Sequence, residues 1–296
     1  MLFGLLSIDK PAGPTSHDIV AAVRRGVGER RIGHAGTLDP LATGVLVLAL
    51  GPATRLLEYL AASTKSYRAT IRLGVTTPTY DLESQPTAEQ PLPAGLTREV
   101  LEDVLERFRG EIEQIPPPYS AVKIGGQAAH RLARAGERVE LAPRRVTIFA
   151  LTIEDFSPPL VTLSLTCSAG TYVRSLAHDL GQMLGCGAAL SALTRTASGR
   201  FRLEDAAPWA DLRVGFADGS WRRWLLPPDL ALDGTPQITL SDEDFRLVMN
   251  GMPILAAAVS EGLARAYGPD GQLAAVLAGD PTQGRWLPRK VFAKSP

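Results

Sequence analysis

The order of strand-like and helix-like segments along the chain constrains the fold more than any other feature. Apolar runs over 3–8 and 45–50 and an alternating pattern over 65–73 predict strands, while the apolar spacing after Ser16 predicts an amphipathic helix with Ser16 as its N-cap. Further segments follow as far as Phe201 without a steady strand–helix–strand rhythm, and they include a loop over 84–96 and a strand over 119–124. This order favours a mixed α/β fold of the α+β kind over a doubly wound parallel sheet.

The composition changes near 204–235, where prolines and tryptophans are concentrated. From about Pro236, short strand-like pieces alternate with glycine and proline turns. We therefore predict a larger domain over 1–235 and a small C-terminal β domain over 236–296, which suits a chain of 296 residues. The alternative is that the C-terminal pieces pack onto the main sheet.

The formal net charge of zero conceals an uneven distribution of charge. Residues 1–80 carry nine basic and five acidic side chains, and residues 119–202 carry ten and five. Arginine, which binds phosphate bidentately and stacks on bases, supplies 26 of the 31 basic side chains. Two cationic blocks on one face would form a nucleic-acid binding surface. The alternative is that both are solvated surface charges.

Several classes of protein are disfavoured by missing signals. The longest near-apolar run, 44–53, is far shorter than the roughly 20 residues of a membrane helix, and Asp9 and Lys10 end the apolar start of the chain. Two cysteines make neither a disulfide framework nor a four-cysteine zinc site. The chain has no phosphate-binding loop, dinucleotide fingerprint or His-Glu-x-x-His motif. We expect a cytoplasmic protein without a membrane segment.

The densest candidate for chemistry is the loop from Gly33 to Gly44, which contains Asp39 and three glycines. Such glycines indicate positive φ or a ligand pressed against the backbone. Pro40 holds Asp39 extended, so its carboxylate could serve as nucleophile or base at the start of a buried strand. The alternative is that Asp39 only organises an Asx turn.

A second candidate is Arg174. If Thr171 is the N-cap of the following helix, Arg174 lies in the first turn, where a cation opposes the helix dipole. That placement suggests a carboxylate or phosphate partner, and pairing with Asp39 would lower the pKa of that carboxyl group. The alternative is an arginine that extends into solvent.

A third candidate is Tyr67, which lies on a predicted strand between Lys65 and Arg68. A tyrosine in this setting can stack on a base while the cations bind phosphate. The alternative is an ordinary half-buried tyrosine.

Together these segments closely resemble the TruB family of tRNA pseudouridine synthases. The resemblance covers about residues 3–202 in order. It is carried by the following segments: 4–11, 13–16, 33–44, 65–67, 117–123, 132–134, 170–174, 179–181 and 184–188. It implies a catalytic domain with a central, mainly antiparallel sheet. Residues 236–296 resemble a PUA-like RNA-binding β domain only loosely, and the acidic insert at about 81–118 resembles those of the stand-alone bacterial branch.

The resemblance also implies a reaction, the isomerisation of uridine 55 in the T arm of tRNA to pseudouridine. The glycosidic bond moves from N1 to C5 of the same uracil, which needs no redox cofactor, ATP or metal. Asp39 would be the nucleophile, attacking either the ribose or the base. Arg174 would be its ion-pair partner, and Tyr67 would stack on the target uracil.

Substrate contacts are implied in the same way. Tyr172 and Leu193 would line the pocket, and His34 would fill the space that the flipped base leaves. Lys10 and Lys123 would bind phosphates, so affinity should fall steeply with salt.

Three alternatives remain. The chain could be a tRNA-folding chaperone, or a pseudouridine synthase acting at another RNA site. A glycosidase or nucleosidase using Asp39 would need a second carboxylate as acid/base. We expect a monomer that needs no obligate protein partner, because no long heptad pattern or interface stripe is present.

Overall fold

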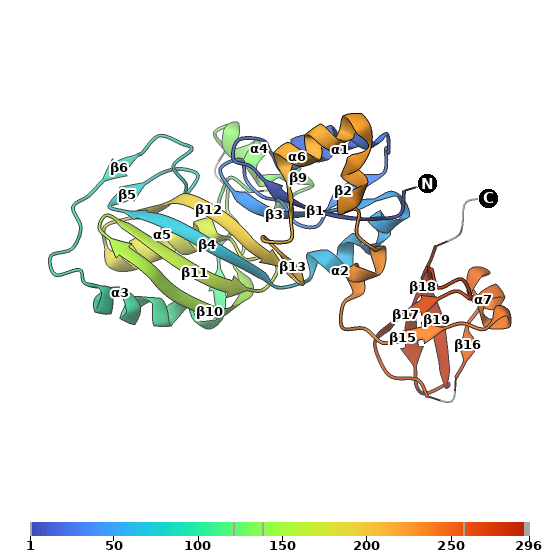
Figure 1. Cartoon of the computed structure of the whole chain (residues 1–296). Coiled ribbons are helices and arrows are strands. Elements are labelled where there is room, and N and C mark those ends of the chain that lie inside the picture. The colour runs from blue at the N-terminus through green and yellow to red at the C-terminus, as the bar shows by residue number, and fades with distance from the viewer. Residues whose placement is uncertain (1, 121, 138, 257, 293–296) are drawn as a thin grey trace.

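The computed structural model describes residues 2–120, 122–137, 139–256 and 258–292 (Figure 1). Its main body is a ten-stranded sheet. All neighbouring strands are antiparallel except two pairs, β1 with β14 and β3 with β12. The predicted mixed fold with a mainly antiparallel central sheet is therefore confirmed.

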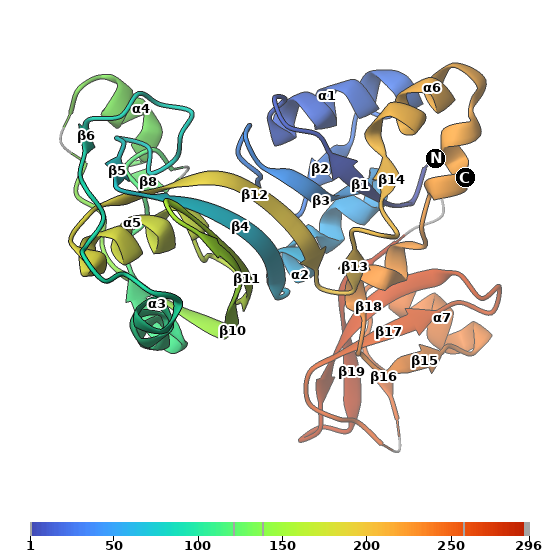
Figure 2. The same cartoon turned by 60° about the vertical axis from the view of Figure 1, so that its left-hand side comes forward.

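The strands of this sheet follow one another in space in a different order from the sequence. The order is β14 (Ala207–Pro208), β1 (Gly4–Lys10), β3 (Thr43–Leu50), β12 (Ala188–Ser198), β4 (Lys65–Leu73), β11 (Leu160–Cys167), β10 (Arg144–Ser157) and β7 (Gly110–Gln114), with β13 (Phe201–Arg202) beside β12 and β2 (Ile32–His34) beside β3. Strands β12 and β4 therefore lie in the middle and join the two halves of the sheet, as Figure 2 shows.

Helices cover the sheet in two groups. Helices α1 (Ser16–Val27) and α6 (Trp209–Asp218) pack together beside β1 and β2, whereas α5 (Val173–Leu184) packs on β12 and β4 with α3 (Arg98–Leu105) next to it (Figure 2). Thr15, not Ser16, caps α1, through a capping box with Asp18. The Ser16 side chain is therefore free to bond elsewhere, and it bonds to the backbone of Leu38.

Strand β3 is apolar almost throughout because both of its faces are buried. Leu46, Leu48 and Leu50 belong to the core beneath α1 and α5, and the alternate residues Val45, Val47 and Ala49 belong to a second core on the opposite face. A strand covered on both sides needs apolar residues at every position, as the sequence has.

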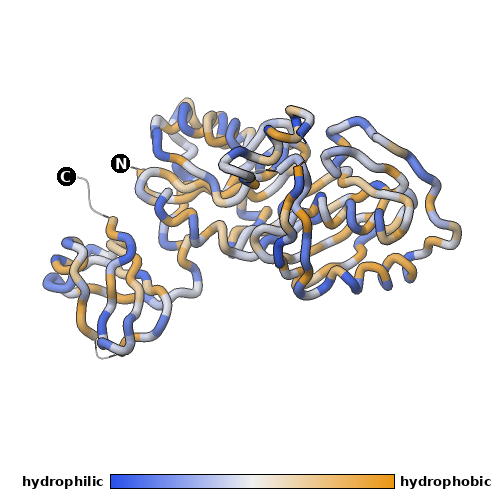
Figure 3. Tube along the Cα trace, turned by 180° about the vertical axis from the view of Figure 1, so that it is seen from behind, coloured by the Kyte–Doolittle hydropathy of each residue, from blue (hydrophilic) through white to orange (hydrophobic). Residues whose placement is uncertain are grey.

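The C-terminal segment has a sheet and a core of its own. Its strands are ordered β15 (Gln237–Thr239), β17 (Leu263–Tyr267), β18 (Leu273–Asp280), β19 (Arg285–Val291) and β16 (Ile254–Leu255), with helix α7 (Asp242–Met249) beside them. Figure 3 shows hydrophobic residues recurring along the strands of both sheets. Val276 and Phe292 reach the second core of the main body, where the Phe3 and Phe292 ring centroids are 5.1 Å apart.

The acidic segment 81–118 is an integral part of the main body. It contains α3, whose Leu101 and Leu105 are fully buried in the core, and it ends with the edge strand β7. The segment predicted as a loop at 84–96 contains one two-residue strand, β6 (Ala88–Glu89), paired with β5 (Val75–Thr76).

Short elements complete the described fold. They are η1 (Gly51–Leu56), α2 (Leu57–Ala61), η2 (Glu106–Phe108), β8 (Lys123–Ile124), β9 (Gln127–Ala128), α4 (Ala129–Arg134), η3 (Ser220–Trp224) and η4 (Pro228–Leu232). Of the strand predicted over 119–124, the described residues, which omit 121, form only β8. Within the described ranges, no helix has the length and apolar character needed to cross a membrane.

Candidate active site

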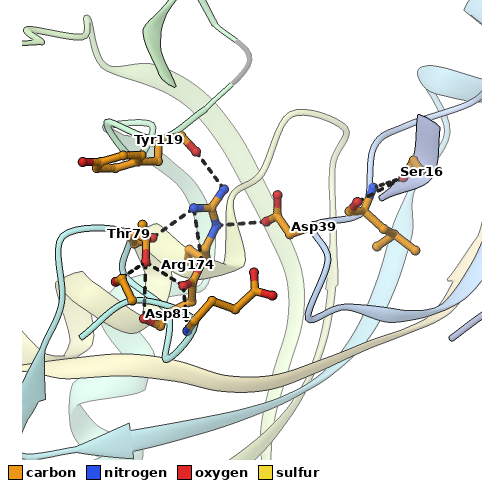
Figure 4. Close-up of polar contacts among 9 residues, drawn as sticks. Ser16, Asp39, Thr79, Asp81, Tyr119 and Arg174 are labelled. Atoms are coloured by element: carbon orange, nitrogen blue, oxygen red, sulfur yellow. Dashed lines mark hydrogen bonds and ion pairs between the residues drawn. The ribbon is translucent and has the colours of Figure 1, made fainter. Parts of the chain in front are cut away.

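The loop that carries Asp39 connects β2 to β3 and is held on both sides of this residue. The Ser16 hydroxyl donates to the Leu38 carbonyl at 3.0 Å and accepts from the Leu38 amide at 2.8 Å (Figure 4). On the other side, the Gly13 amide donates to the Pro40 carbonyl at 2.9 Å. These bonds fix the backbone from which the Asp39 carboxylate projects.

Lys10 stabilises the same loop through hydrogen bonds to backbone carbonyls. Its ammonium group donates to the carbonyls of Pro11, Pro40 and Ala42 at 2.9, 3.4 and 2.6 Å, and the residue is fully buried. Burial lowers the pKa of Lys10, while Glu83 and Asp39 act in the opposite direction. The expected phosphate contact would require the ammonium group to leave these carbonyls, because Lys10 is fully buried against them.

Arg174 joins Asp39 to a second carboxylate. Its Nε lies 2.9 Å from Asp39 Oδ2, and its Nη1 lies 3.4 Å from Asp81 Oδ2 (Figure 4). The guanidinium also donates to the carbonyls of Thr79 at 2.9 Å and Tyr119 at 3.1 Å. Arg174 is the second residue of α5, after the N-cap Tyr172, so the anionic partner expected at this helix start is present.

The net effect on the pKa of Asp39 is the reverse of our expectation. Burial of the carboxyl group raises its pKa, and this outweighs the lowering by Arg174; Asp81 raises the pKa further. Arg174 cannot stabilise the Asp39 carboxylate fully because it is shared with Asp81.

Asp81 is one candidate for the second carboxylate that a glycosidase would require, but its environment does not suit acid/base catalysis. Its side chain is only 4% exposed. Oδ1 accepts from the Thr79 hydroxyl at 2.6 Å and the Glu83 amide at 3.2 Å, and Oδ2 faces Arg174. With both oxygens occupied, Asp81 is suited to holding Arg174 rather than to exchanging protons with substrate.

Tyr67 lies on β4 opposite Arg195 of β12. Burial raises the pKa of the Tyr67 phenol, which stays protonated at neutral pH, and the Asp39 charge contributes in the same direction. Arg195 is 1% exposed and donates to the carbonyls of Val45 at 2.6 Å and Gly36 at 3.2 Å. The structure thus brings Tyr67 within electrostatic reach of Asp39.

Gly44 allows the loop to meet β12 closely. Its φ is +95°, and a Cβ at this position would lie 2.3 Å from the Arg195 carbonyl oxygen. Only glycine fits this junction, which sets where the Asp39 loop ends.

The remaining predicted residues have varied surroundings. His34 lies on β2 with its ring edge-on to His17 at 5.3 Å, and burial lowers its pKa. The Tyr172 backbone is bound at both its amide and carbonyl by the Gln114 side chain, at 2.7 and 3.0 Å. Leu193 is buried on β12, and Lys123 is exposed on β8.

Two residues of the site were missed. Asp81 is 93 positions from Arg174 in the sequence, and no local sequence pattern predicts their ion pair. Arg195 did leave a signal, because it occupies an inward position in the alternating strand Leu193–Arg195–Ala197, where an apolar residue is expected. In the part of the chain that the structure describes, no cluster of three or more His, Cys, Asp or Glu side chains could hold a metal ion.

Comparisons with known proteins agree with this fold. Residues 24–173 match the model of the TruB family pseudouridylate synthase N-terminal domain, and residues 174–233 match a tRNA pseudouridylate synthase B C-terminal domain. A tRNA pseudouridine synthase B of Dehalococcoides mccartyi is 42% identical over 98% of this chain and 97% of its own. One of Pseudomonas aeruginosa is 44% identical over 86% and 84%.

Solved structures show the same architecture. A Cbf5–Nop10–Gar1 complex matches with a TM-score of 0.75 and 27% identity, covering 98% of this chain and 85% of that one. An H/ACA ribonucleoprotein bound to a substrate RNA matches with a TM-score of 0.74 and 25% identity, covering 99% and 86%.

A mainly antiparallel sheet with an aspartate and an arginine paired beside its central strands, together with these matches, defines a pseudouridine synthase. The chain belongs to the TruB family.

Proposed function

We propose that the protein isomerises uridine 55 in the T arm of tRNA to pseudouridine, with Asp39 as the nucleophile. The observation that supports this most strongly is the ion pair between Asp39 and the buried guanidinium of Arg174. The loop that carries Asp39 is held in place by the hydrogen bonds of Ser16 to Leu38. The relatives named tRNA pseudouridine synthase B support tRNA as the substrate.

In this reaction the Asp39 carboxylate supplies the electron pair and is regenerated at the end. The N1–C1′ bond of the uridine breaks, the uracil turns in place, and a C5–C1′ bond forms. The hydrogen at C5 then leaves as a proton, and N1 gains one. Arg174 favours the ionised form of the carboxylate, against the effect of burial, and fixes its orientation.

The target base must leave the stacked T loop to reach Asp39. We assign the Tyr67 ring to stacking on this base, Leu193 and Tyr172 to the pocket wall, and His34 to the vacated space. Lys123 is exposed on β8 and is available for a phosphate. The C-terminal sheet would act as a PUA-like RNA-binding domain.

The position of the modified uridine is tested with two tRNA transcripts, one natural and one with cytidine at position 55. Both are labelled with tritium at every uridine C5, and the tritium released to water is counted. We expect one equivalent from the natural transcript and none from the other. Equal release from both would place the reaction at another uridine.

The lysines give a matched pair of variants for RNA binding. Lys123→Met should reduce the slope of log affinity against log salt by about one, as the loss of one phosphate contact does. Lys10→Met should leave that slope unchanged and lower the rate constant, because it frees the Asp39 loop. Filter binding at four salt concentrations measures both slopes, and single-turnover assays measure the rate constant. A reduced slope for Lys10→Met would show that Lys10 does contact a phosphate.

The raised pKa of Asp39 predicts an acidic limb in the pH profile. The nucleophile must be ionised, so the single-turnover rate constant should fall as the pH is lowered and reach half its maximum above pH 3.8, the ordinary value for this carboxyl group. Circular dichroism at each pH controls for unfolding. A rate constant that stays level down to pH 4 in folded protein would contradict this prediction.

A further inference from the structure

Tyr80 lies between the two residues through which segment 77–81 holds Arg174. The preceding residue, Thr79, offers its backbone carbonyl to Arg174 Nη1 at 2.9 Å. The following residue, Asp81, offers its carboxylate to the same nitrogen at 3.4 Å. Any change in the backbone at Tyr80 would therefore move two of the acceptors that orient the guanidinium.

The backbone at Tyr80 is unusual. Its φ is +63°, and among the described residues it is the only one other than glycine in this left-handed region. A residue with an aromatic side chain rarely adopts this conformation, so the surroundings must hold it there. Two backbone bonds to Leu190 contribute, one accepted by the Tyr80 carbonyl and one donated by the Leu82 amide, both at 2.9 Å.

The Tyr80 side chain provides a further attachment. Its ring stacks on the His178 ring with centroids 3.9 Å apart and an interplanar angle of 9°. His178 lies on α5 four residues after Arg174, so the two project from the same face of that helix. The stack thus ties segment 77–81 to the helix that carries Arg174.

We infer that the Tyr80–His178 stack is a positioning device for Arg174, and through it for the Asp39 carboxylate. The inference rests on the proposed roles of Asp39 and Arg174. The Tyr80 side chain meets α5 through the stack of its ring on His178, so the ring face is the part that acts. Neither ring is assigned a contact with substrate.

The test compares three substitutions at Tyr80 in the full-length protein. Tyr80→Phe keeps the ring, Tyr80→Ala removes it, and Tyr80→Gly removes it while making positive φ easy to adopt. We expect Tyr80→Phe to keep the parent single-turnover rate constant within about twofold. The Ala and Gly variants should lose about tenfold or more, as small misplacements of catalytic groups do, with the KM for tRNA unchanged.

Each other outcome at Tyr80 overturns the inference. A Tyr80→Gly variant as fast as the parent would mean that the backbone conformation alone positions Arg174. A raised KM with an unchanged rate constant would mean that the ring contacts RNA. Melting temperatures are measured first, and the assays are run where every variant is folded.

His178 supplies the second arm. His178→Phe should keep the rate constant because it keeps a stacking partner, while His178→Ala should lose about as much as Tyr80→Ala. The double variant Tyr80→Ala with His178→Ala should be no slower than either single one, since both remove the same stack. If the fold-loss in rate constant of the double variant equalled the product of the two single losses, the two residues would act independently, and the inference would be overturned.

Asp39→Asn is assayed beside these variants. If it retains activity, the proposed role of Asp39 fails. If it is inactive and Tyr80→Ala equals the parent, only the positioning role fails.

Discussion

Replacing Asp39 by asparagine is expected to lower the single-turnover rate constant for tRNA isomerisation by at least about 10⁴-fold, because the amide is not a nucleophile. Affinity for tRNA should change little, since the side chain keeps its shape. The free energy of unfolding at pH 7 should be unchanged or higher. Burial raises the pKa of Asp39, so the ionised form opposes folding above that pKa.

Asp205→Asn is the matched control, because it removes an exposed carboxylate outside the site by the same substitution. It should keep the parent rate constant. Rapid-quench kinetics measures the rate constants, and filter binding measures affinity. An Asp39→Asn variant that binds tRNA and still reacts within tenfold of the parent would remove Asp39 from the chemistry.

Replacing Arg174 by methionine is expected to damage both catalysis and stability. The rate constant should fall by about 10²–10³-fold, the range seen when one preorganised electrostatic contact is lost. Asp81, only 4% exposed, would be left as a buried charge without its cation. Breaking a buried pair in this way costs about 3–5 kcal/mol, which urea unfolding can measure.

A second substitution separates the two effects. Combining Arg174→Met with Asp81→Asn removes the uncompensated buried charge, so stability should recover substantially while the rate constant stays low. If activity recovered together with stability, Arg174 would serve folding alone, and its proposed role in orienting Asp39 would be lost.

The fold was predictable where local patterning decides the structure. The alternation over 65–73 gave strand β4 its bounds, since inward and outward residues differ along the whole strand. The start of α1 was misjudged by one residue, because Thr15 and Ser16 are both good caps and only the distant contact of Ser16 with Leu38 separates them. The order of strands in the sheet depends on pairings between distant segments and could not be predicted in the same way.

The site shows the same division. Asp39, Arg174 and Tyr67 stand in distinctive local sequences that made them candidates, and the structure pairs the first two, whereas Asp81 depends on a contact across the fold. Lys10 was expected to bind phosphate because it lies near a glycine-rich loop, and its burial beneath that loop could not be predicted from the sequence. The pKa of Asp39 could not be predicted from one partner, because burial and a second carboxylate decide its direction.

The most direct test of the central claim uses a tRNA ligated from pieces so that uridine 55 alone carries tritium at C5. The parent protein and Asp39→Asn are each incubated with it, after equal binding has been shown. The account predicts one equivalent of tritium released by the parent and none by the variant. Release by both proteins, or by neither, would contradict it.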